Sequence, residues 1–435
     1  MTEHYTFGTW ALVALVVGNA VGAGIYVTSG FALADLGSRE WVMLAWFVGG
    51  LIALCGALSY GMLVQGLTDS GGEYLFLSRS IHPVAGFIAG WVSLLAGFPG
   101  AIAFAATAFE AYSLSAIPSL NHLPKDVIAC SVVLLAGVIH IIRVGAGART
   151  HEVIVAFMLL VLTLIVVWGL IQFNLNPALP VKVVGDLTPF NIWAFANSLV
   201  WISLSYSGFN AAAYVAGEVS NPKKVVPKAM LIGTALTMAL CLAVNGIMIY
   251  SAPLELIIAQ PDVAVHAAQS MAGNTGKRII EVVIAVSLLT SITAMVLAGP
   301  RVYSKMAEDG ALPKRFAAKH GEPPRMSIAL QVLTALALIL LADLRGLLSY
   351  LGFTLSMCLA LAVSSLFVRH WRFAEKPNSM WYPLAPLAFV SCTIVFAVLS
   401  AINEPAKLFV AVPTILMGVI AYLLSAGFKT TAIND

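Results

Sequence analysis

Long apolar stretches with almost no charged residues recur along the whole of this 435-residue chain. A helix needs about 20 mainly apolar residues to cross a bilayer, so each such stretch predicts one membrane-spanning helix. Only 10% of the residues are charged, against roughly 25% in soluble domains. We therefore predict an all-α integral membrane protein with twelve transmembrane helices, at residues 10–31, 41–67, 83–113, 126–142, 153–172, 191–217, 229–250, 279–300, 326–342, 346–368, 379–402 and 406–427.

The connections between these stretches are short, so we expect a single transmembrane domain over residues 1–435. Lys and Arg accumulate in the cytoplasmic loops of membrane proteins. If the N-terminus lies inside, 16 of the 23 Lys and Arg residues fall on the cytoplasmic side. This distribution predicts a multi-pass protein of the plasma membrane, of the bacterial inner-membrane type, with both termini in the cytoplasm.

The first predicted helix contains residues that do not suit a regular helix. Its middle reads GNAVGAGIY, from Gly18 to Tyr26, with three glycines and an asparagine, all of which are poor helix formers. One interpretation is close packing against another helix, because Gly18 and Gly22 have the spacing of the small-residue motif. The other is a helix that is broken inside the membrane.

The sixth predicted helix is interrupted in a similar way, which favours the second interpretation. It reads SLSYSGFNAAAYVAGE, with Ser207, Gly208 and Asn210 near its middle. Paired interruptions in two halves of a chain indicate a transporter binding site, because unpaired backbone groups are costly in hydrocarbon unless they line a cavity. The N–H groups of Ala23 and Gly24 would then bind a carboxylate. The carbonyls that would bind an ammonium are those of Ala20, Val21, Leu204 and Ser207.

Four motifs of the chain resemble those of one family, the amino acid–polyamine–organocation transporters. They are GNAVGAGIY, GGEYLFLSRSIHPVAGFIAGW, SYSGFNAAAYVAGEVSNPKKVVPKA and GPRVYSKMAEDGALPKRFA, in this order along the chain. The resemblance implies an inverted repeat of two five-helix units, residues 10–172 and 191–370, followed by two peripheral helices over residues 379–427. It also implies transport of amino acids or related amines by alternating access.

The same resemblance implies that the substrate lies between the broken first and sixth helices. The substrate-binding residues that it predicts are Ala20, Val21, Gly22, Ala23, Gly24, Leu204, Ser207, Gly208, Phe209 and Asn210. Many family members carry an aromatic gate where this chain has Leu204, so an aromatic lid must come from elsewhere. None of the predicted binding residues is charged, which favours a neutral and fairly apolar amino acid as substrate.

The fifth and eighth predicted helices bear on the choice of coupling ion. Relatives coupled to protons or working as exchangers often carry a lysine in the fifth helix, where this chain has Met158 or Leu159. Ser287, Thr290 and Ser291 share one face of the eighth helix. Together with the carbonyls of Gly18 and Val21, these hydroxyls predict a sodium site. The alternatives are hydroxyls bonded to their own helix, a proton-coupled transporter, and an exchanger that needs no ion.

Two further features of the sequence each allow two interpretations. Glu110 is the one carboxylate deep within a predicted helix, and we consider both a role in substrate or proton handling and an interfacial position. The stretch that begins at Gly71 predicts either a short amphipathic helix on the cytoplasmic face or a simple loop.

The sequence also limits the classes of function. We find no phosphate-binding loop or metal-ligand spacing. We expect no enzyme activity, no nucleic-acid partner, no obligatory protein partner and no cofactor except possible sodium; a membrane amino acid sensor and a channel are the rival functions.

Overall fold

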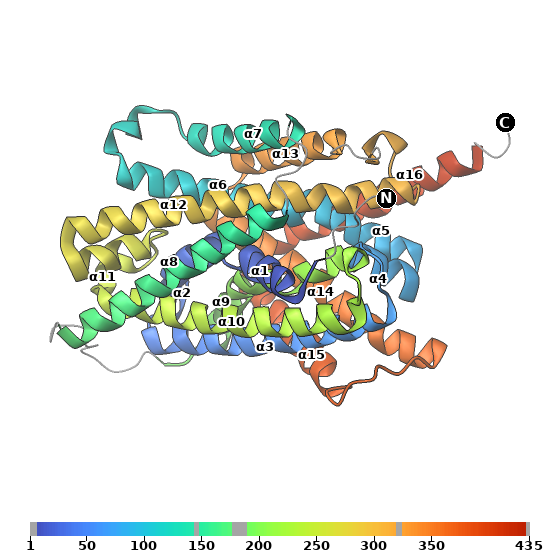
Figure 1. Ribbon diagram of the computed structural model, residues 1–435, viewed down its shortest axis with the longest axis horizontal. Coiled ribbons are helices and arrows are strands. Elements are labelled where there is room, and N and C mark those ends of the chain that lie inside the picture. The colour runs from blue at the N-terminus through green and yellow to red at the C-terminus, as the bar shows by residue number, and fades with distance from the viewer. Residues whose placement is uncertain (1–6, 143–147, 176–188, 319–323, 432–435) are drawn as a thin grey trace.

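The computed structural model of the chain describes residues 7–142, 148–175, 189–318 and 324–431. Within these residues it contains helices and loops and no β-strand, and most helices run along the long axis of the molecule (Figure 1). The α-helices are α1 (Thr9–Ala20), α2 (Ala23–Leu36), α3 (Arg39–Gly66), α4 (Gly72–Ser80), α5 (Pro83–Val92), α6 (Phe98–Ala116), α7 (Val127–Ile142), α8 (Ala148–Leu175), α9 (Ile192–Tyr206), α10 (Pro222–Ser251), α11 (Leu254–Ile257), α12 (Val263–Glu308), α13 (Arg325–Leu341), α14 (Leu344–Phe373), α15 (Leu384–Asn403) and α16 (Ala406–Thr431). Short helices of other types are η1 (Ser93–Gly97), η2 (Pro118–His122), η3 (Ser207–Glu218) and η4 (Lys314–Phe316).

The helices coincide with the apolar stretches of the sequence. Nine spans among the described residues are long and apolar enough to cross a membrane, and α7 and α13 are shorter apolar helices. The remaining predicted span, residues 191–217, is formed by α9 and η3 together. A multi-pass membrane protein is thereby confirmed, while the count of twelve spans and the five-plus-five inverted repeat stay predictions.

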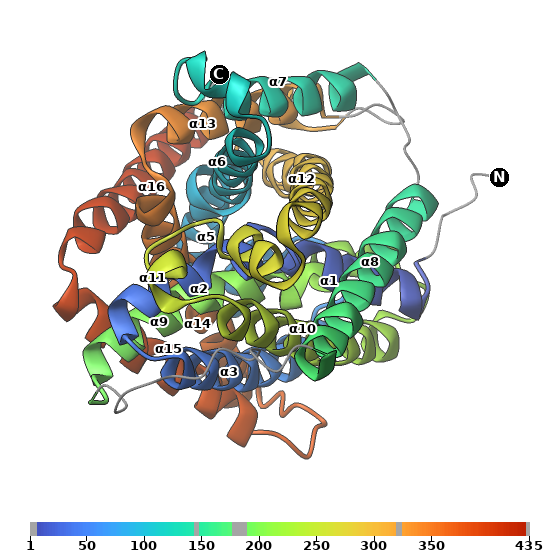
Figure 2. The same ribbon diagram turned by 90° about the vertical axis from the view of Figure 1, so that its left-hand side faces the viewer.

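The first interrupted helix lies at the centre of the bundle. In its most apolar window, 78% of the residues of Thr9–Leu36 are buried, compared with 22% in the windows of α8 and α16. Seen along the helices, α1 lies inside a ring to which α7, α8 and α16 contribute (Figure 2). The outer helices turn large apolar side chains outward, as Leu135, Leu164 and Leu341 do, and such a surface suits contact with lipid.

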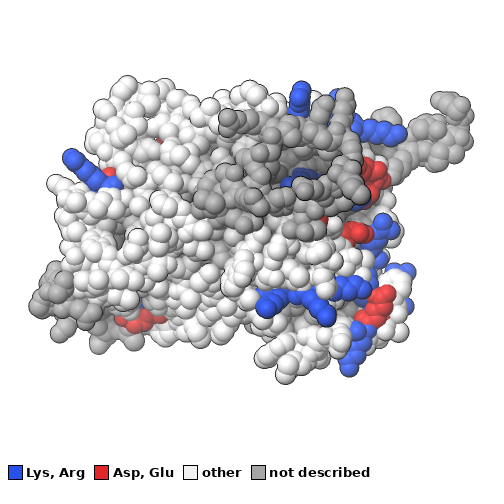
Figure 3. Space-filling model, viewed as in Figure 1, with Lys and Arg blue, Asp and Glu red and all other residues white. Residues whose placement is uncertain are grey.

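Charged side chains are distributed unevenly over the surface. The middle of the face in Figure 3 is almost free of them, and most of the visible Lys and Arg side chains lie at the right-hand end. Helix α16, near the end of the chain, extends to the same end of the molecule (Figure 1). The apolar middle is therefore the part of the molecule that fits the hydrocarbon layer, because charge is costly there.

The first helix is broken where the glycines predict it. Helix α1 ends at Ala20, Val21 and Gly22 leave the helical conformation, with ψ angles of 79° and −153°, and α2 begins at Ala23. The N–H groups in the first turn of a helix have no partner within it. The break thus exposes the N-terminal end of α2 in the interior of the bundle, where the dipole of α2 favours negative charge.

The sixth helix differs from the predicted broken helix. Helix α9 ends at Tyr206, and the chain continues without an extended segment as the 3₁₀-helix η3. The winding of the chain becomes tighter at Ser207, because its backbone N–H donates to the carbonyl of Leu204, three residues earlier. The hydroxyl of Ser207 donates to the same carbonyl at 2.7 Å. A carbonyl has two lone pairs, so the Leu204 carbonyl has none left for an ammonium in this conformation.

The chain between α3 and α5 turns back into the molecule. The residues Gly71 and Gly72 have φ angles of 140° and 53°, which glycine adopts without strain. The turn directs α4 inward, so most of its residues are buried. The expected short helix therefore forms but does not lie on a surface.

The buried helix α4 also contacts the end of α12. Its Tyr74 donates to Asp309 at 3.0 Å, and burial, together with the charge of Asp309, raises the pKa of Tyr74.

A polar network joins the last two helices to the core. Lys407 of α16 is buried, donates to Asn197 of α9 and to Ser400 at 2.7 Å, and pairs with Glu404 at 3.2 Å. Arg345 of α14 continues the network toward Asp35 of α2, 2.9 Å away, and lies 5.1 Å from the ring centre of Trp201. The buried charge of Lys407 thus links α15 and α16 to α9, and the exposed Arg345 extends the network from α14 to α2.

Candidate functional site

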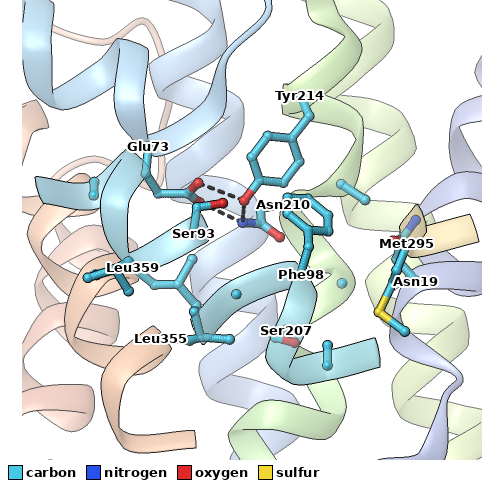
Figure 4. A pocket seen from close by; sticks show the side chains of 17 residues that line it. Asn19, Glu73, Ser93, Phe98, Ser207, Asn210, Tyr214, Met295, Leu355 and Leu359 are labelled. Atoms are coloured by element: carbon cyan, nitrogen blue, oxygen red, sulfur yellow. Dashed lines mark hydrogen bonds between the residues drawn. The ribbon is translucent and has the colours of Figure 1, made fainter. Parts of the chain in front are cut away.

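A cavity of about 110 Å³ lies beside the break in the first helix. One water molecule needs on the order of 10–15 Å³, so the cavity has room for a small solute. Its walls come from α1, α4, α5, η1, α6, η3, α12 and α14, and Figure 4 shows the side chains that surround it. The lining residues are Asn19, Glu73, Ala89, Val92, Ser93, Gly97, Phe98, Ala101, Ser207, Gly208, Asn210, Ala211, Tyr214, Met295, Leu355, Cys358 and Leu359.

Three of the ten predicted substrate-binding residues line this cavity, namely Ser207, Gly208 and Asn210. The other seven, Ala20, Val21, Gly22, Ala23, Gly24, Leu204 and Phe209, are not among its lining residues. Phe209 points elsewhere, since its ring packs edge-on against Tyr60 and Phe389.

The residues of the first helix nevertheless lie directly behind the cavity wall. A Cβ atom on Gly208 would be 2.3 Å from the backbone nitrogen of Ala20, and one on Gly24 would be 2.3 Å from Oγ of Ser205. The absence of side chains at these two glycines therefore lets the break in the first helix contact both α9 and η3. The break in the first helix therefore packs against η3, which also forms part of the cavity wall.

A buried carboxylate forms one end of the cavity. Glu73 of α4 is 8% exposed, and three neutral side chains donate to it. Figure 4 shows two of them, Asn210 and Tyr214. Tyr60 and Asn210 donate to Oε1 at 2.7 and 2.6 Å, and Tyr214 donates to Oε2 at 2.6 Å. None of the ion pairs among the described residues includes Glu73. The cavity therefore contains a buried carboxyl group that the sequence-based prediction of an uncharged pocket did not include.

Several lining residues could not be found from sequence patterns. Glu73 lies outside every predicted span, and the one local signal is the glycine pair before it, which allows the turn into the bundle. The wall from α5 to α6 depends on η1, a π-helical turn over Ser93–Gly97. Such turns are frequent at functional sites, but no residue pattern in the stretch 83–113 indicates one. Apolar periodicity alone does not show which residues of α12 and α14 face the cavity.

The hydroxyls predicted to bind sodium do not converge in this conformation. Ser287 receives a hydrogen bond from Tyr26 at 3.2 Å and donates to the sulfur of Met158 at 3.4 Å. Thr290 donates to the carbonyl of Val286 in its own helix at 2.8 Å. Ser291 alone lies near the break, since a Cβ on Gly22 would be 3.0 Å from its hydroxyl.

Sodium prefers several oxygen ligands around one point. The carbonyls of Gly18 and Val21 were expected to complete such a set, but a thioether and a helix carbonyl engage two of the three hydroxyls. Among the described residues, no group of three His, Cys, Asp or Glu side chains could hold a metal ion either. The sodium site stays a prediction that this donor set does not favour.

Glu110 has a clear structural partner at the start of α7. Its two carboxylate oxygens accept the backbone N–H groups of Asp126 and Ala129 at 2.7 and 2.8 Å. A carboxylate bound to the first N–H groups of a helix stabilises that helix. Glu110 is 7% exposed and is not among the residues that line the cavity, so its position is that of a helix cap.

Comparison with known proteins gives a consistent result. The sequence profile of a family described as "Amino acid permease" matches residues 7–425. The large neutral amino acids transporter small subunit 2 of Mus musculus is 25% identical, over 97% of this chain and 81% of its own. The serine/threonine exchanger of Bacillus subtilis (strain 168) is 26% identical, over 86% of this chain and 85% of its own. The human cystine/glutamate transporter is also 26% identical, over 95% of this chain and 83% of its own.

Proposed function

The chain belongs to the amino acid permease family, and on this premise we propose that it exchanges neutral amino acids across the plasma membrane by alternating access. The observation that carries the proposal is the cavity beside the broken first helix, which is lined by Ser207, Gly208 and Asn210. A break in a membrane helix persists where it lines a cavity or meets a ligand. The similar proteins are by name amino acid transporters and an exchanger.

The broken helix offers groups for the parts that all amino acids share. We propose that the N–H groups of Ala23 and Gly24, at the start of α2, bind the substrate carboxylate, because a helix N-terminus favours an anion. The carbonyl of Ala20 accepts the N–H of Gly22 at 3.0 Å and keeps a second lone pair for the ammonium. Since Gly208 contacts Ala20, the substrate side chain would extend into the cavity from this point.

The walls of the cavity support a neutral substrate. Most of the lining side chains are apolar, among them Val92, Phe98, Leu355 and Leu359. Such a lining binds the aliphatic part of a side chain by removing it from water. The negative charge of Glu73 at one end disfavours an acidic substrate.

The polar groups around the break support exchange without a coupling ion. The hydroxyls of Ser287 and Thr290 are engaged with Met158 and Val286, so a sodium ion has few oxygen ligands there. The similar protein from Bacillus subtilis is by name an exchanger. We also propose that the chain lies in a bacterial inner membrane with both termini in the cytoplasm. Most Lys and Arg side chains visible in Figure 3 gather at one end of the surface, to which α16 extends, and such residues accumulate on the cytoplasmic side.

Uptake into liposomes tests the proposal. Purified protein is reconstituted into vesicles with or without internal alanine, and uptake of labelled alanine is measured with and without gradients of sodium and of pH. We expect uptake only into the preloaded vesicles and no effect of sodium. Uptake into empty vesicles driven by a sodium or a pH gradient would show coupling to that ion, and binding of amino acids without uptake under any condition would favour the sensor.

A substitution at the break tests the site. A leucine in place of Gly24 would collide with Ser205, because even a Cβ atom there would be 2.3 Å from its hydroxyl. We expect Gly24→Leu to abolish exchange while the protein still inserts into the membrane. Gly8→Leu is the matched control, since a Cβ on Gly8 meets no atom within 4 Å. Equal activity of the two variants would contradict a binding role for the break.

A further inference from the structure

One end of the cavity presents hydrogen-bond acceptors, and we propose that it selects the substrate by its side chain. This end binds neutral side chains that donate a hydrogen bond, such as a hydroxyl group, and rejects carboxylates. It consists of Glu73, Asn210 and Tyr214, with Tyr60 behind them. The inference rests on the proposed amino acid transport and adds the chemical class of the preferred substrates.

The donor hydrogens of this cluster are all engaged within it. A tyrosine hydroxyl has one hydrogen and an asparagine amide has two. Tyr60 and Tyr214 each give their hydrogen to Glu73. Asn210 gives one to Glu73 at 2.6 Å and one to the hydroxyl of Tyr214 at 3.2 Å. A substrate that enters therefore finds no free donor among these three side chains.

The carboxylate also determines which atom of Asn210 faces the substrate. A carboxylate only accepts hydrogen bonds, so the amide nitrogen of Asn210 must point toward Glu73 and its oxygen must point away. In Figure 4 the oxygen lies on the side of the amide turned away from Glu73. None of the hydrogen bonds among the described residues reaches this oxygen. It is thus an acceptor on the cavity wall, and Glu73 is the residue that positions it.

Charge acts in the same direction as hydrogen bonding. Glu73 is buried, and the groups that donate to it are neutral. A second carboxylate at this end would be repelled, whereas a donor group is attracted to the charged acceptor. Ser93 is the other polar residue nearby (Figure 4), and its hydroxyl can donate or accept, so it creates no preference of its own.

Pairs of amino acids with nearly equal shape provide the test. In the experiment, exchange of labelled alanine in proteoliposomes is measured with threonine or valine as inhibitor, and then with asparagine or aspartate. Threonine has a hydroxyl where valine has a methyl group, so we expect it to inhibit with roughly tenfold or higher affinity, as a hydrogen bond to a charged group allows. Aspartate should inhibit at least tenfold more weakly than asparagine.

The variant Glu73→Gln shows whether the carboxylate is the cause. A glutamine brings donor hydrogens of its own and removes the charge, so the threonine-to-valine ratio should approach one and aspartate should begin to inhibit. Glu110→Gln is the matched control, because Glu110 is also a buried glutamate but caps α7. It should leave both ratios unchanged wherever the protein folds.

The possible outcomes separate the two proposals. Wild-type protein that exchanges alanine but binds valine as well as threonine would overturn this inference and leave the proposed transport standing. Wild-type protein that binds no amino acid would contradict the proposed function itself. If Glu73→Gln does not fold, the wild-type ratios still decide, because they depend on the acceptor end and not on a variant. Unchanged inhibition ratios in a folded Glu73→Gln protein would also overturn the inference that the carboxylate selects the substrate.

Discussion

Single glycines set the distance between the first helix and the segments that cross it. A Cβ atom on Gly208 would be 2.3 Å from the nitrogen of Ala20 and 2.6 Å from the carbonyl carbon of Asn19. Both are backbone atoms, so no side-chain rotation can relieve the contact. The approach of η3 to the break thus depends on the missing side chain at this position.

We expect Gly208→Ala to separate η3 from α1 and to reduce exchange at least tenfold. Overpacking of this kind costs about 1–3 kcal/mol, so the thermal unfolding midpoint should also fall. Gly246→Ala is the control, because a Cβ there has its nearest neighbour, Met43, at 3.6 Å. It should be neutral or slightly stabilising, since alanine suits a helix interior better than glycine. Equal exchange by both variants would contradict the role given to Gly208.

Not all residues of the candidate site could be predicted from the sequence. The break at Val21 and Gly22 was predictable, because glycine and asparagine residues weaken a helix in the middle of an apolar stretch. Glu73 was not, because no local rule states that a loop residue returns to the interior. Its burial depends on contacts with Tyr60, Asn210 and Tyr214, which are far apart along the chain or come from another helix.

At the scale of helices, the sequence located the elements better than it described their shape. The apolar stretches fall on helices, since length and hydropathy decide what can cross a membrane. The 3₁₀ winding of η3 and the π-helical turn η1 were not predicted, because both depend on which hydrogen bonds form between neighbouring turns. The residues of α4 were expected at a surface, and the left-handed turn at Gly71 and Gly72 buries them instead.

The network around Lys407 makes a prediction for the last two helices. In Lys407→Met, Asn197 and Glu404 lose a charged partner that is buried between α9, α15 and α16. We expect a loss of about 1–3 kcal/mol of stability, the range of hydrogen bonds to charged groups, seen as a lower thermal unfolding midpoint in detergent. Lys376→Met, at an exposed site, should leave the midpoint unchanged. An equal shift of the unfolding midpoint in both variants would mean that the Lys407 network does not contribute to stability.

For the whole molecule, alternating access requires that the cavity open to water at some stage of transport. Cys358 of α14 lines the cavity, whereas Cys55, Cys130, Cys241 and Cys392 do not. The protein thus carries one native cysteine from which access to its interior can be measured.

We expect a small water-soluble thiol reagent to remove most of the exchange activity, because a group attached to Cys358 would fill the cavity. Transported amino acids should slow the inactivation. Cys358→Ser should exchange amino acids and resist the reagent, and its activity without reagent serves as the control. Inactivation of Cys358→Ser at the wild-type rate would mean that the reagent acts at another cysteine and that the cavity stays closed to water.

The π-helical turn over Ser93–Gly97 has a consequence for comparing this chain with its relatives. A turn of this kind contains one residue more than an α-helical turn, and one residue corresponds to about 100° of rotation. Deleting a single residue there would rotate the start of α6 and turn Phe98 and Ala101 away from the substrate. If a relative lacks this extra residue and is aligned without a gap here, the residues matched along α6 would not occupy the same positions on the cavity wall. Substrate specificity inferred from such an alignment would be mistaken.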